Sequence, residues 1–468
     1  MFLKISHSKE ILSTFISSVD IFIMLKKYKR SFLVIMLVFL LPITGFSQTG
    51  PGGVGNAATN VLWLDANRGI TLAGTSVTNW ADQSGNTFNA IPPSTAARPT
   101  IINSSVNGYP SINFDGTNDQ LRITDAAAFD LTQWDIFIVP IVNVAKNFNA
   151  WMVKGLDGAE NYEVLSYADN RIHTPVIFTT GARTFPSSPA GQLSTTNFTI
   201  IEYSYATTVG RDIYRNNASI YSDNENRTPR ANNFDLAIGN EQGTSGRFIN
   251  GGLAEVLMYN TRLNSAQRII VNNYLAAKYN RPLTTADVYN EDDAANGNFD
   301  HEVAGIGRVD AANTHTDAQG TGIVRVSDPA NLDNDEFLLW GHDDGNLTLS
   351  NTTDIPTTQT LSRFGRIWRV SEVNVSGTPV DVGTVDIRVD MTGITGFSEA
   401  YPPQLLVDTD NDGLFNDETP ITTATSLGSN QYRFNGVAAL INNARFTFAL
   451  GRKIIVTNKR ITYRVDKN

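Results

Sequence analysis

The sequence predicts an all-β protein built from two sandwich domains with one helix between them. Three observations support this fold class. From about Val61, short apolar runs alternate with turns rich in Gly, Asn, Asp and Ser, which is typical of antiparallel sandwiches and barrels. One helical pattern stands out, over residues 265–278. The 468 residues are enough for two or three domains, and 41% hydrophobic residues are enough to build their cores.

A leader precedes the first domain. Residues 26–30 are rich in Lys and Arg, and the apolar run 32–41 is followed by Pro42 and by small residues. This layout is typical of a secretory signal peptide, and we expect residues 1–47 to be removed after Ser47. The ten-residue apolar run is too short for a bilayer span of about 20 residues. Met24 is a second possible initiator. If translation begins there, residues 1–23 are not part of the protein.

Composition and charge exclude several classes of function. The sequence has no cysteine, so disulfides, thiolate metal sites and a cysteine nucleophile are excluded. Without the six basic and two acidic residues of the leader, 30 basic and 44 acidic residues remain, a net charge of −14. This balance argues against nucleic-acid binding and favours attraction of divalent cations. We expect a secreted or outer-surface protein with no transmembrane span in the mature chain.

The first domain is expected over residues 58–280, after a flexible glycine-rich lead-in at residues 48–57. Its helix is capped by Asn264 or Ser265 and is followed by Pro282, which places a domain boundary near residue 281. Pro140 indicates a sheet edge or a bulge. The clearest strands expected in this domain lie at residues 61–64, 111–114, 135–142, 198–205 and 253–259.

The second domain is expected to be another β-sandwich, over residues 281–452. Apolar and charged residues alternate over 385–391, the pattern of a strand with one buried face. Further strands are expected at residues 336–341, 366–373, 403–407 and 445–450. Residues 453–468 form a basic tail, either a last edge strand protected by charge or the start of another module.

The first domain resembles the laminin-G-like branch of the concanavalin A-like lectin/glucanase superfamily. The resemblance covers roughly residues 58–280 and implies a jelly-roll sandwich with one closing helix. The stretches that carry it are WLDA (63–66), WADQSGN (80–86), INFDGTNDQL (112–121), IYRNNASI (213–220) and FINGGLAEVLMYNTRLNSAQRIIVNNYLAAKYN (248–280).

The second half looks like the β-domain that follows such modules in large surface proteins of gliding, type IX-secreting bacteria. That companion domain has no established chemistry to transfer. The stretches that carry the likeness are GNFDHEVAGIGR (297–308), FLLWGHDDG (337–345), RIWRVSE (366–372) and LLVDTDNDG (405–413).

A calcium loop is predicted in the second domain. Calcium takes six to eight hard oxygen ligands, and the pattern D-x-D-x-D-G can wrap three carboxylates around one ion. The alternative is an acidic turn without an ion, because Asp, Asn and Gly are ordinary turn residues. The candidate ligands are Asp408, Asp410 and Asp412, the backbone carbonyl of Leu414, and the side chains of Asn416 and Asp417.

A second calcium site is implied by the resemblance to the lectin superfamily. Asp82, Asn86 and Glu255 match positions at which relatives often build a structural site. The alternative places Asp82 and Ser84 in an Asx turn and leaves Glu255 as a solvated strand residue.

A catalytic site is not expected. Glucanases on this fold place carboxylates at E-x-D-x-x-E spacing on one strand, so that they flank the glycosidic bond, and Glu255 has no acidic neighbour on its strand. His342, Asp343 and Asp344 are interpreted as a loop at the end of a strand rather than as a metal cluster.

Sugar binding is the small-molecule function that the sequence leaves open. Aromatic faces stack on sugar C–H surfaces while amide groups bind hydroxyls. Candidates on expected loops are Trp151, Asn161, Tyr162 and Tyr167.

Our leading hypothesis is a non-catalytic secreted or cell-surface protein that binds a glycan or another surface protein in adhesion, with calcium as a structural cofactor. The alternatives are a polysaccharide hydrolase or lyase on the same fold, and a structural spacer in a surface assembly.

Overall fold

The computed structural model describes residues 49–244 and 246–452, all of which belong to one compact unit. The expected leader and the basic tail lie outside the described residues. Within the described part the protein is all-β, with a single α-helix, α3 (Ser265–Tyr279). None of its helices is both long enough and apolar enough to cross a membrane. The all-β fold class expected from the sequence is confirmed.

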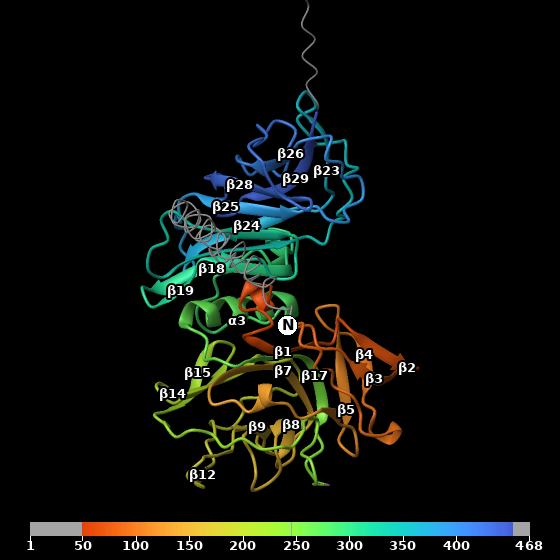
Figure 1. Ribbon diagram of the computed structural model, residues 1–468, viewed down its shortest axis with the longest axis vertical. Helices are drawn as coiled ribbons and strands as arrows, with labels where there is room; N and C mark the ends of the chain where they lie inside the picture. The colour runs from red at the N-terminus through yellow and green to blue at the C-terminus, as the bar shows by residue number, and fades with distance from the viewer. Residues whose placement is uncertain (1–48, 245, 453–468) are drawn as a thin grey trace, which may run out of the picture. The chain divides into compact units, whose positions relative to one another are not determined.

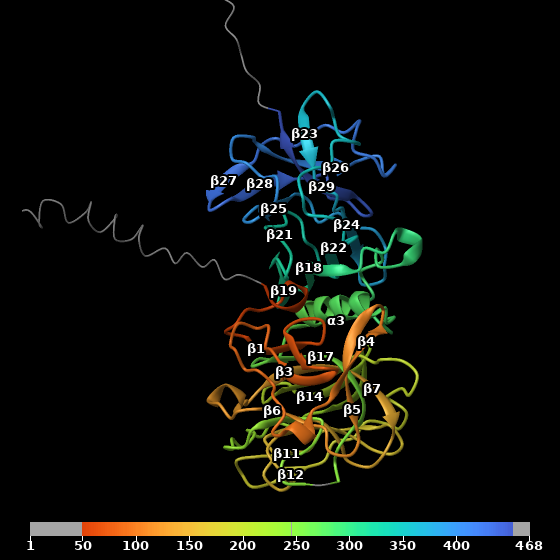
Figure 2. The same cartoon turned by 90° about the vertical axis from the view of Figure 1, so that its right-hand side faces the viewer.

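Four large antiparallel sheets and helix α3 lie in layers (Figures 1 and 2). A five-stranded sheet packs on a ten-stranded sheet, and one buried apolar cluster between them forms the first core. Helix α3 lies on the other face of the ten-stranded sheet. A seven-stranded sheet covers the far side of the helix, and a last five-stranded sheet closes the second sandwich core. The helix is therefore the middle layer between two sandwiches.

The first sandwich occupies residues 60–259. Its ten-stranded sheet contains, in order, β15 (Ala218–Asp223), β14 (Gly210–Arg215), β13 (Ile201–Ala206), β7 (Trp134–Val144), β17 (Asn250–Tyr259), β5 (Tyr109–Asp115), β4 (Thr100–Val106), β3 (Ser76–Trp80) and β2 (Ile70–Ala73), with β1 (Asn60–Asp65) paired to β17. The facing sheet contains β10 (Ile172–His173), β9 (Tyr162–Ser166), β8 (Asn149–Lys154), β16 (Leu236–Ile238) and β6 (Leu121–Ile123), and a separate ribbon joins β11 (Val176–Ile177) to β12 (Arg183–Thr184).

The second sandwich occupies residues 301–451. Its seven-stranded sheet contains β19 (Asn313–His315), β18 (His301–Asp310), β22 (Glu336–His342), β24 (Trp368–Asn374), β29 (Arg445–Gly451) and β23 (Thr360–Arg363), with β26 (Pro403–Asp408) paired to β29. The facing sheet contains β20 (Asp317–Ala318), β21 (Val324–Ser327), β25 (Val385–Asp390), β28 (Gln431–Val437) and β27 (Thr425–Gly428). Short 3-10 turns are η1 (Pro51–Gly53), η2 (Thr95–Ala97), η3 (Ala127–Phe129) and η4 (Ala294–Asn296).

Strand β7 shows why the central sheet is apolar on both faces. Ile136 and Ile138 join the sandwich core, while Phe137 and Val139, which point to the opposite face, join the cluster around α3. The register with β17 shifts beside Pro140, which pairs with Leu253. Pro140 therefore sits at a bulge, as the sequence indicated, because a proline cannot donate to the ladder.

Helix α3 has the capping box that its first residues indicate. The Asn264 side chain accepts from the Gln267 N–H, and the Gln267 side chain accepts from the Asn264 N–H. The apolar pattern suggested one buried face, but every residue from Ile269 to Tyr279 is buried. The reason is the second sandwich, whose Val303, Phe337 and Leu339 complete the cluster on the other side of the helix.

The glycine-rich stretch before the first strand is not a flexible lead-in over the residues that the structure describes. Residues 50–54 are buried. Gly52 lies against Ile270 of α3, and a Cβ on Gly53 would come within 2.6 Å of the Ala318 Cβ. His315 fixes the segment further through a 3.0 Å hydrogen bond between its Nε2 and the Gly53 carbonyl. Close packing against both neighbours, rather than flexibility, accounts for glycine here.

The shared core predicts that truncating Ile270 destabilises the protein. Ile270 is fully buried in the apolar cluster that residues of both sandwiches share, so Ile270→Ala removes apolar contacts and leaves a cavity. We expect the free energy of unfolding to fall by about 2–5 kcal/mol in denaturant titrations. Ile102→Ala is the matched control, because Ile102 is 45% exposed and its truncation leaves no cavity. Equal losses in the two variants would contradict the shared core.

Because His315 is buried where it holds Gly53, we expect acid to weaken the packing of residues 50–54 on the rest of the protein. Burial lowers the pKa of His315 to about 4, so the folded protein holds the neutral imidazole. The unfolded chain binds the proton more readily below about pH 6.5, and stability is therefore lost as the pH falls from about 6.5 towards 4. His315→Gln removes this titration. Chemical unfolding between pH 7 and pH 4.5 should show a smaller loss of unfolding free energy for the variant than for the wild type. Identical pH profiles of the two proteins would be evidence against this role of His315.

Candidate functional site

A polar cleft of about 420 Å³ opens between the two sandwiches, beside the C-terminal half of α3. The first sandwich and the helix contribute the end of β1, the turn before β5 and the last turns of α3. The second sandwich contributes the start of β18, the end of β22 and the segment before β24. The residues that line the cleft are Asp65, Asn67, Arg68, Asn107, Gly108, Tyr109, Tyr274, Lys278, His301, Glu302, His342, Asp344 and Arg366.

Glu255 organises the floor beneath the cleft. The side chain is fully buried on β17 and faces α3. Its Oε1 accepts from Trp63 Nε1 at 2.7 Å and from the Tyr274 hydroxyl at 2.9 Å. Its Oε2 accepts from Lys278 Nζ at 2.8 Å and from the Tyr279 hydroxyl at 2.7 Å. Four donors satisfy this buried carboxylate, which would otherwise be very costly to bury.

Arg68 links the two sandwiches across the cleft. Lys278 Nζ lies 2.8 Å from Asp65 Oδ2, and Arg68 Nε lies 3.5 Å from the same oxygen. Arg68 Nη2 reaches the second sandwich, where it is 3.7 Å from Glu302 Oε1 and donates to the Thr321 hydroxyl at 3.1 Å. The first sandwich and α3 thus place a row of paired charges along one wall.

The opposite wall is built around Glu302 and His342. His342 Nδ1 accepts from the Asp344 N–H at 3.0 Å, and its Nε2 lies 3.0 Å from Glu302 Oε2 and 3.1 Å from Arg366 Nη1. Burial lowers the pKa of His342, which favours the neutral form of the ring. Burial alone raises the pKa of Glu302, but the bond to His342 and the charges of Arg366 and Arg68 outweigh it, so the net pKa is lowered. Glu302 is therefore an ionised acceptor.

The mouth of the cleft is formed by Tyr109, His301 and Asp344. The carboxylate of Asp300, whose Oδ1 lies 2.7 Å from His301 Nδ1, raises the pKa of His301. The ring of His301 lies 6.0 Å from that of Tyr109 and stacks 5.6 Å from that of His342. The Asp344 side chain is 61% exposed and lies 3.9 Å from His301 Nε2. An aromatic edge thus stands beside exposed hydrogen-bonding groups.

The charges of this region favour a neutral ligand. Three carboxylates (Asp65, Glu302 and Asp344) and three permanent cations (Arg68, Lys278 and Arg366) line the cleft, so its charges balance. Each of the cations contacts one of these carboxylates. A charged ligand would have to separate an ion pair, whereas hydroxyl groups can join the existing network without doing so.

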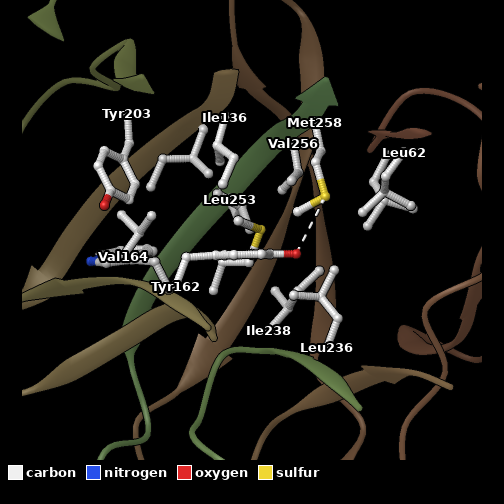
Figure 3. Close-up of a cluster of buried hydrophobic side chains, with 14 of the residues drawn as sticks. Leu62, Ile136, Tyr162, Val164, Tyr203, Leu236, Ile238, Leu253, Val256 and Met258 are labelled. Atoms are coloured by element: carbon white, nitrogen blue, oxygen red, sulfur yellow. Dashed lines mark hydrogen bonds between the residues drawn. The ribbon is translucent and has the colours of Figure 1, made fainter. Parts of the chain in front are cut away.

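Two of the four residues predicted to bind sugar lie on strands in the first core rather than on loops, and a third is buried beside them. Trp151 and Tyr162 are fully buried on β8 and β9, and Asn161 is fully buried beside them. Figure 3 shows Tyr162 among Ile136, Val164, Leu236 and their neighbours, with its hydroxyl directed at Met258. The prediction that Trp151 and Tyr162 sit on loops is wrong, because both lie within strands whose side chains alternate inward and outward. Asn161 does precede β9, outside any strand, but it is buried there.

Tyr167 is the one predicted sugar-binding residue at the surface. It follows β9, is half-buried, and packs against Phe148 and His173 at ring separations of 4.8 and 5.0 Å. It lies apart from the cleft, which Tyr167 does not line.

Asp82, Asn86 and Glu255 do not form a common ligand set. Asp82 Oδ1 accepts from the backbone N–H groups of Trp63 and Ser84, and Oδ2 accepts from the Ser84 hydroxyl and the Phe88 N–H. This is the turn chemistry that the sequence offered as the alternative. Glu255 is neither a ligand nor a solvated residue, because its two oxygens are occupied by the four donors described above. The structure therefore does not bring Asp82, Asn86 and Glu255 together as the calcium site that the resemblance implied.

The predicted loop at Asp408, Asp410 and Asp412 does bring its carboxylates together. One oxygen from each lies within 4.8 Å of the others, and this is the one such acidic or histidine cluster in the described ranges. The three further candidate ligands are exposed in the same loop: Leu414, Asn416 and Asp417.

Sequence reasoning missed the cleft because its residues come from six separate segments that form no local motif. One signal was available. The stretches at 297–308 and 337–345, which carried the likeness to a companion β-domain, contain His301, Glu302, His342 and Asp344.

Comparisons with known proteins add a family match and distant structural similarities. The family described as "Domain of unknown function (DUF8202)" matches residues 267–444, which cover most of α3 and the second sandwich. No curated protein sequence matches the chain.

Among solved structures, Trypanosoma rangeli sialidase is similar at 17% identity and a TM-score of 0.33, over 48% of this chain and 34% of the sialidase. The chain therefore spans about a third of the length of that enzyme. The CBM40 of the Ruminococcus gnavus IT-sialidase, bound to α2,3-sialyllactose, is similar at 12% identity and a TM-score of 0.30, over 34% of this chain and 94% of the module. Domain 4 of the Geobacillus stearothermophilus arabinanase AbnA, in complex with arabinotriose, is similar at 11% identity and a TM-score of 0.32. The similarity covers 46% of this chain and 97% of that domain.

The network around Glu255 predicts a large effect from a small substitution. Glu255→Gln keeps the shape of the side chain but turns its amide N–H₂ towards groups that are themselves donors, and it removes a charge partner of buried Lys278. We expect the free energy of unfolding to fall by about 3–5 kcal/mol in chemical denaturation, as for other broken buried ion pairs. Glu399→Gln, at an exposed position, should change it by less than about 0.5 kcal/mol. A Glu255→Gln protein as stable as this control would argue against the network.

Proposed function

We propose that this protein is a non-catalytic, secreted or cell-surface glycan-binding protein, and that the cleft between its sandwiches receives a neutral glycan. The observation that carries the proposal is the cleft itself, in which an aromatic edge stands beside carboxylate, amide and imidazole groups. Sugars are bound by this combination of an apolar platform and a few converging polar groups. The resemblance of the first domain to laminin-G-like lectins supports the same class of function.

Binding is favoured over glycoside hydrolysis by the state of the acidic groups. Hydrolysis of a glycosidic bond needs one carboxyl group with a raised pKa that can donate a proton to the leaving oxygen. In the cleft, the pKa of Glu302 is lowered and its oxygens are engaged by His342 and by arginines. An ionised, paired carboxylate accepts hydrogen bonds from sugar hydroxyls but does not protonate a leaving group.

Secretion and a role in adhesion remain part of the proposal. They rest on the leader pattern of residues 1–47 and on the likeness of the second half to β-domains of surface proteins in gliding bacteria. An acidic mature chain fits a neutral ligand better than an anionic polymer, which it would repel at long range.

Tyr109 provides the test. We expect residues 48–468 to bind one or more neutral oligosaccharides on a glycan array, and Tyr109→Ala to weaken the strongest interaction at least tenfold in isothermal titration calorimetry. A tenfold loss corresponds to about 1.4 kcal/mol, the scale of one aromatic contact.

Tyr167→Ala is the matched control, since Tyr167 is a half-buried tyrosine away from the cleft. Loss of binding in Tyr167→Ala but not in Tyr109→Ala would place the sugar at the other end of the first sandwich. No binding to any glycan, with calcium or with chelator, would count against the proposal as a whole.

A further inference from the structure

We propose that the loop after β26, residues 408–416, binds one Ca²⁺ ion. Asp408 is the last residue of β26, and Asp410 and Asp412 follow at alternate positions. One carboxylate oxygen from each of the three lies within 4.8 Å of the others. Calcium is the divalent cation that takes such sets of hard oxygen ligands in flexible loops.

The Asp408 side chain supplies the independent observation. Asp408 is 1% exposed, and its Oδ2 accepts from the Gly413 N–H at 2.9 Å, so the carboxylate points into the loop. Its other oxygen, Oδ1, is buried and has no hydrogen-bond partner. A buried carboxylate oxygen without a partner costs a protein free energy. A cation bound in the loop would satisfy it, and Asp410 and Asp412 would supply the neighbouring charges.

The charge of the loop matches a divalent ion. Arg445 Nη1 lies 3.3 Å from Asp408 Oδ2 and donates to Asn411 Oδ1 at 2.8 Å. Arg445 therefore neutralises one of the three carboxylate charges and leaves two. This contact is to Oδ2, and Oδ1 is the oxygen that has no hydrogen-bond partner.

Within the loop, Asp410 Oδ1 accepts from the Asp412 N–H at 3.3 Å and Asp412 Oδ1 accepts from the Leu414 N–H at 2.7 Å. Two further carboxylates, outside the predicted ligand set, hold the rest of the loop in place. Asp354 Oδ1 accepts from the Phe415 and Asn416 N–H groups at 2.6 and 3.1 Å. Glu418 binds the N–H and hydroxyl of Thr409, so it does not act as the bidentate ligand that ends an EF-hand loop. Without that ligand we expect the weak affinity of extracellular calcium modules, on the order of 10⁻⁴–10⁻³ M.

Calorimetric titration of calcium into residues 48–468 tests the site. We expect one ion per chain for the wild type, and at least a tenfold loss of affinity in Asp410→Asn/Asp412→Asn. Both substituted side chains are exposed, and circular dichroism will show that the variant keeps its β fold. Glu399→Gln removes one exposed charge from the same domain and should bind like the wild type.

Two outcomes would overturn the site. One is the absence of binding in the wild type up to about 10 mM calcium, well above the expected dissociation constant. The other is unchanged binding by a folded Asp410→Asn/Asp412→Asn variant, which would place the ion elsewhere. If the double variant does not fold, Asp410→Asn alone gives the same comparison with a smaller change.

Discussion

The architecture depends on the burial of α3 between two sheets. Helices on protein surfaces bury one face, but α3 is covered by β7 and β17 on one side and by β18 and β22 on the other. Its polar residues must therefore find partners inside the protein. Lys278 does so with Glu255 and Asp65, and Asn273 accepts from the N–H groups of Val288 and Tyr289. The two sandwiches consequently share one apolar cluster, which fixes their mutual placement.

The cleft is a consequence of this shared layer. Charged residues from both sandwiches meet beside the C-terminal half of α3. Arg68 contacts Asp65 of the first sandwich and Glu302 of the second, so the same ion pairs line the cleft and connect its walls. A ligand bound there would contact both domains, and a change at the interface would alter the site.

The sequence predicted the elements well and the positions of side chains less well. Strands such as β25 and helix α3 follow from local alternation and capping, which act over a few residues. The failures concern burial. Trp151 and Tyr162 looked available to a ligand, and residues 50–54 looked flexible, because a single sequence does not reveal what packs against a segment from elsewhere in the chain. The Asp408 loop was predictable because all of its acidic residues lie within one short motif.

The all-β class, the single closing helix and the acidic loop follow from the sequence alone, since each depends on neighbours a few residues apart. The position of Glu255 at the centre of a buried network, and the meeting of His301, His342 and Arg68 in one cleft, follow from the packing of distant segments. The partners of Glu255 lie as many as 192 residues away in the chain. Contacts at that separation are set by how the sheets pack on α3, and periodicity carries no information about them.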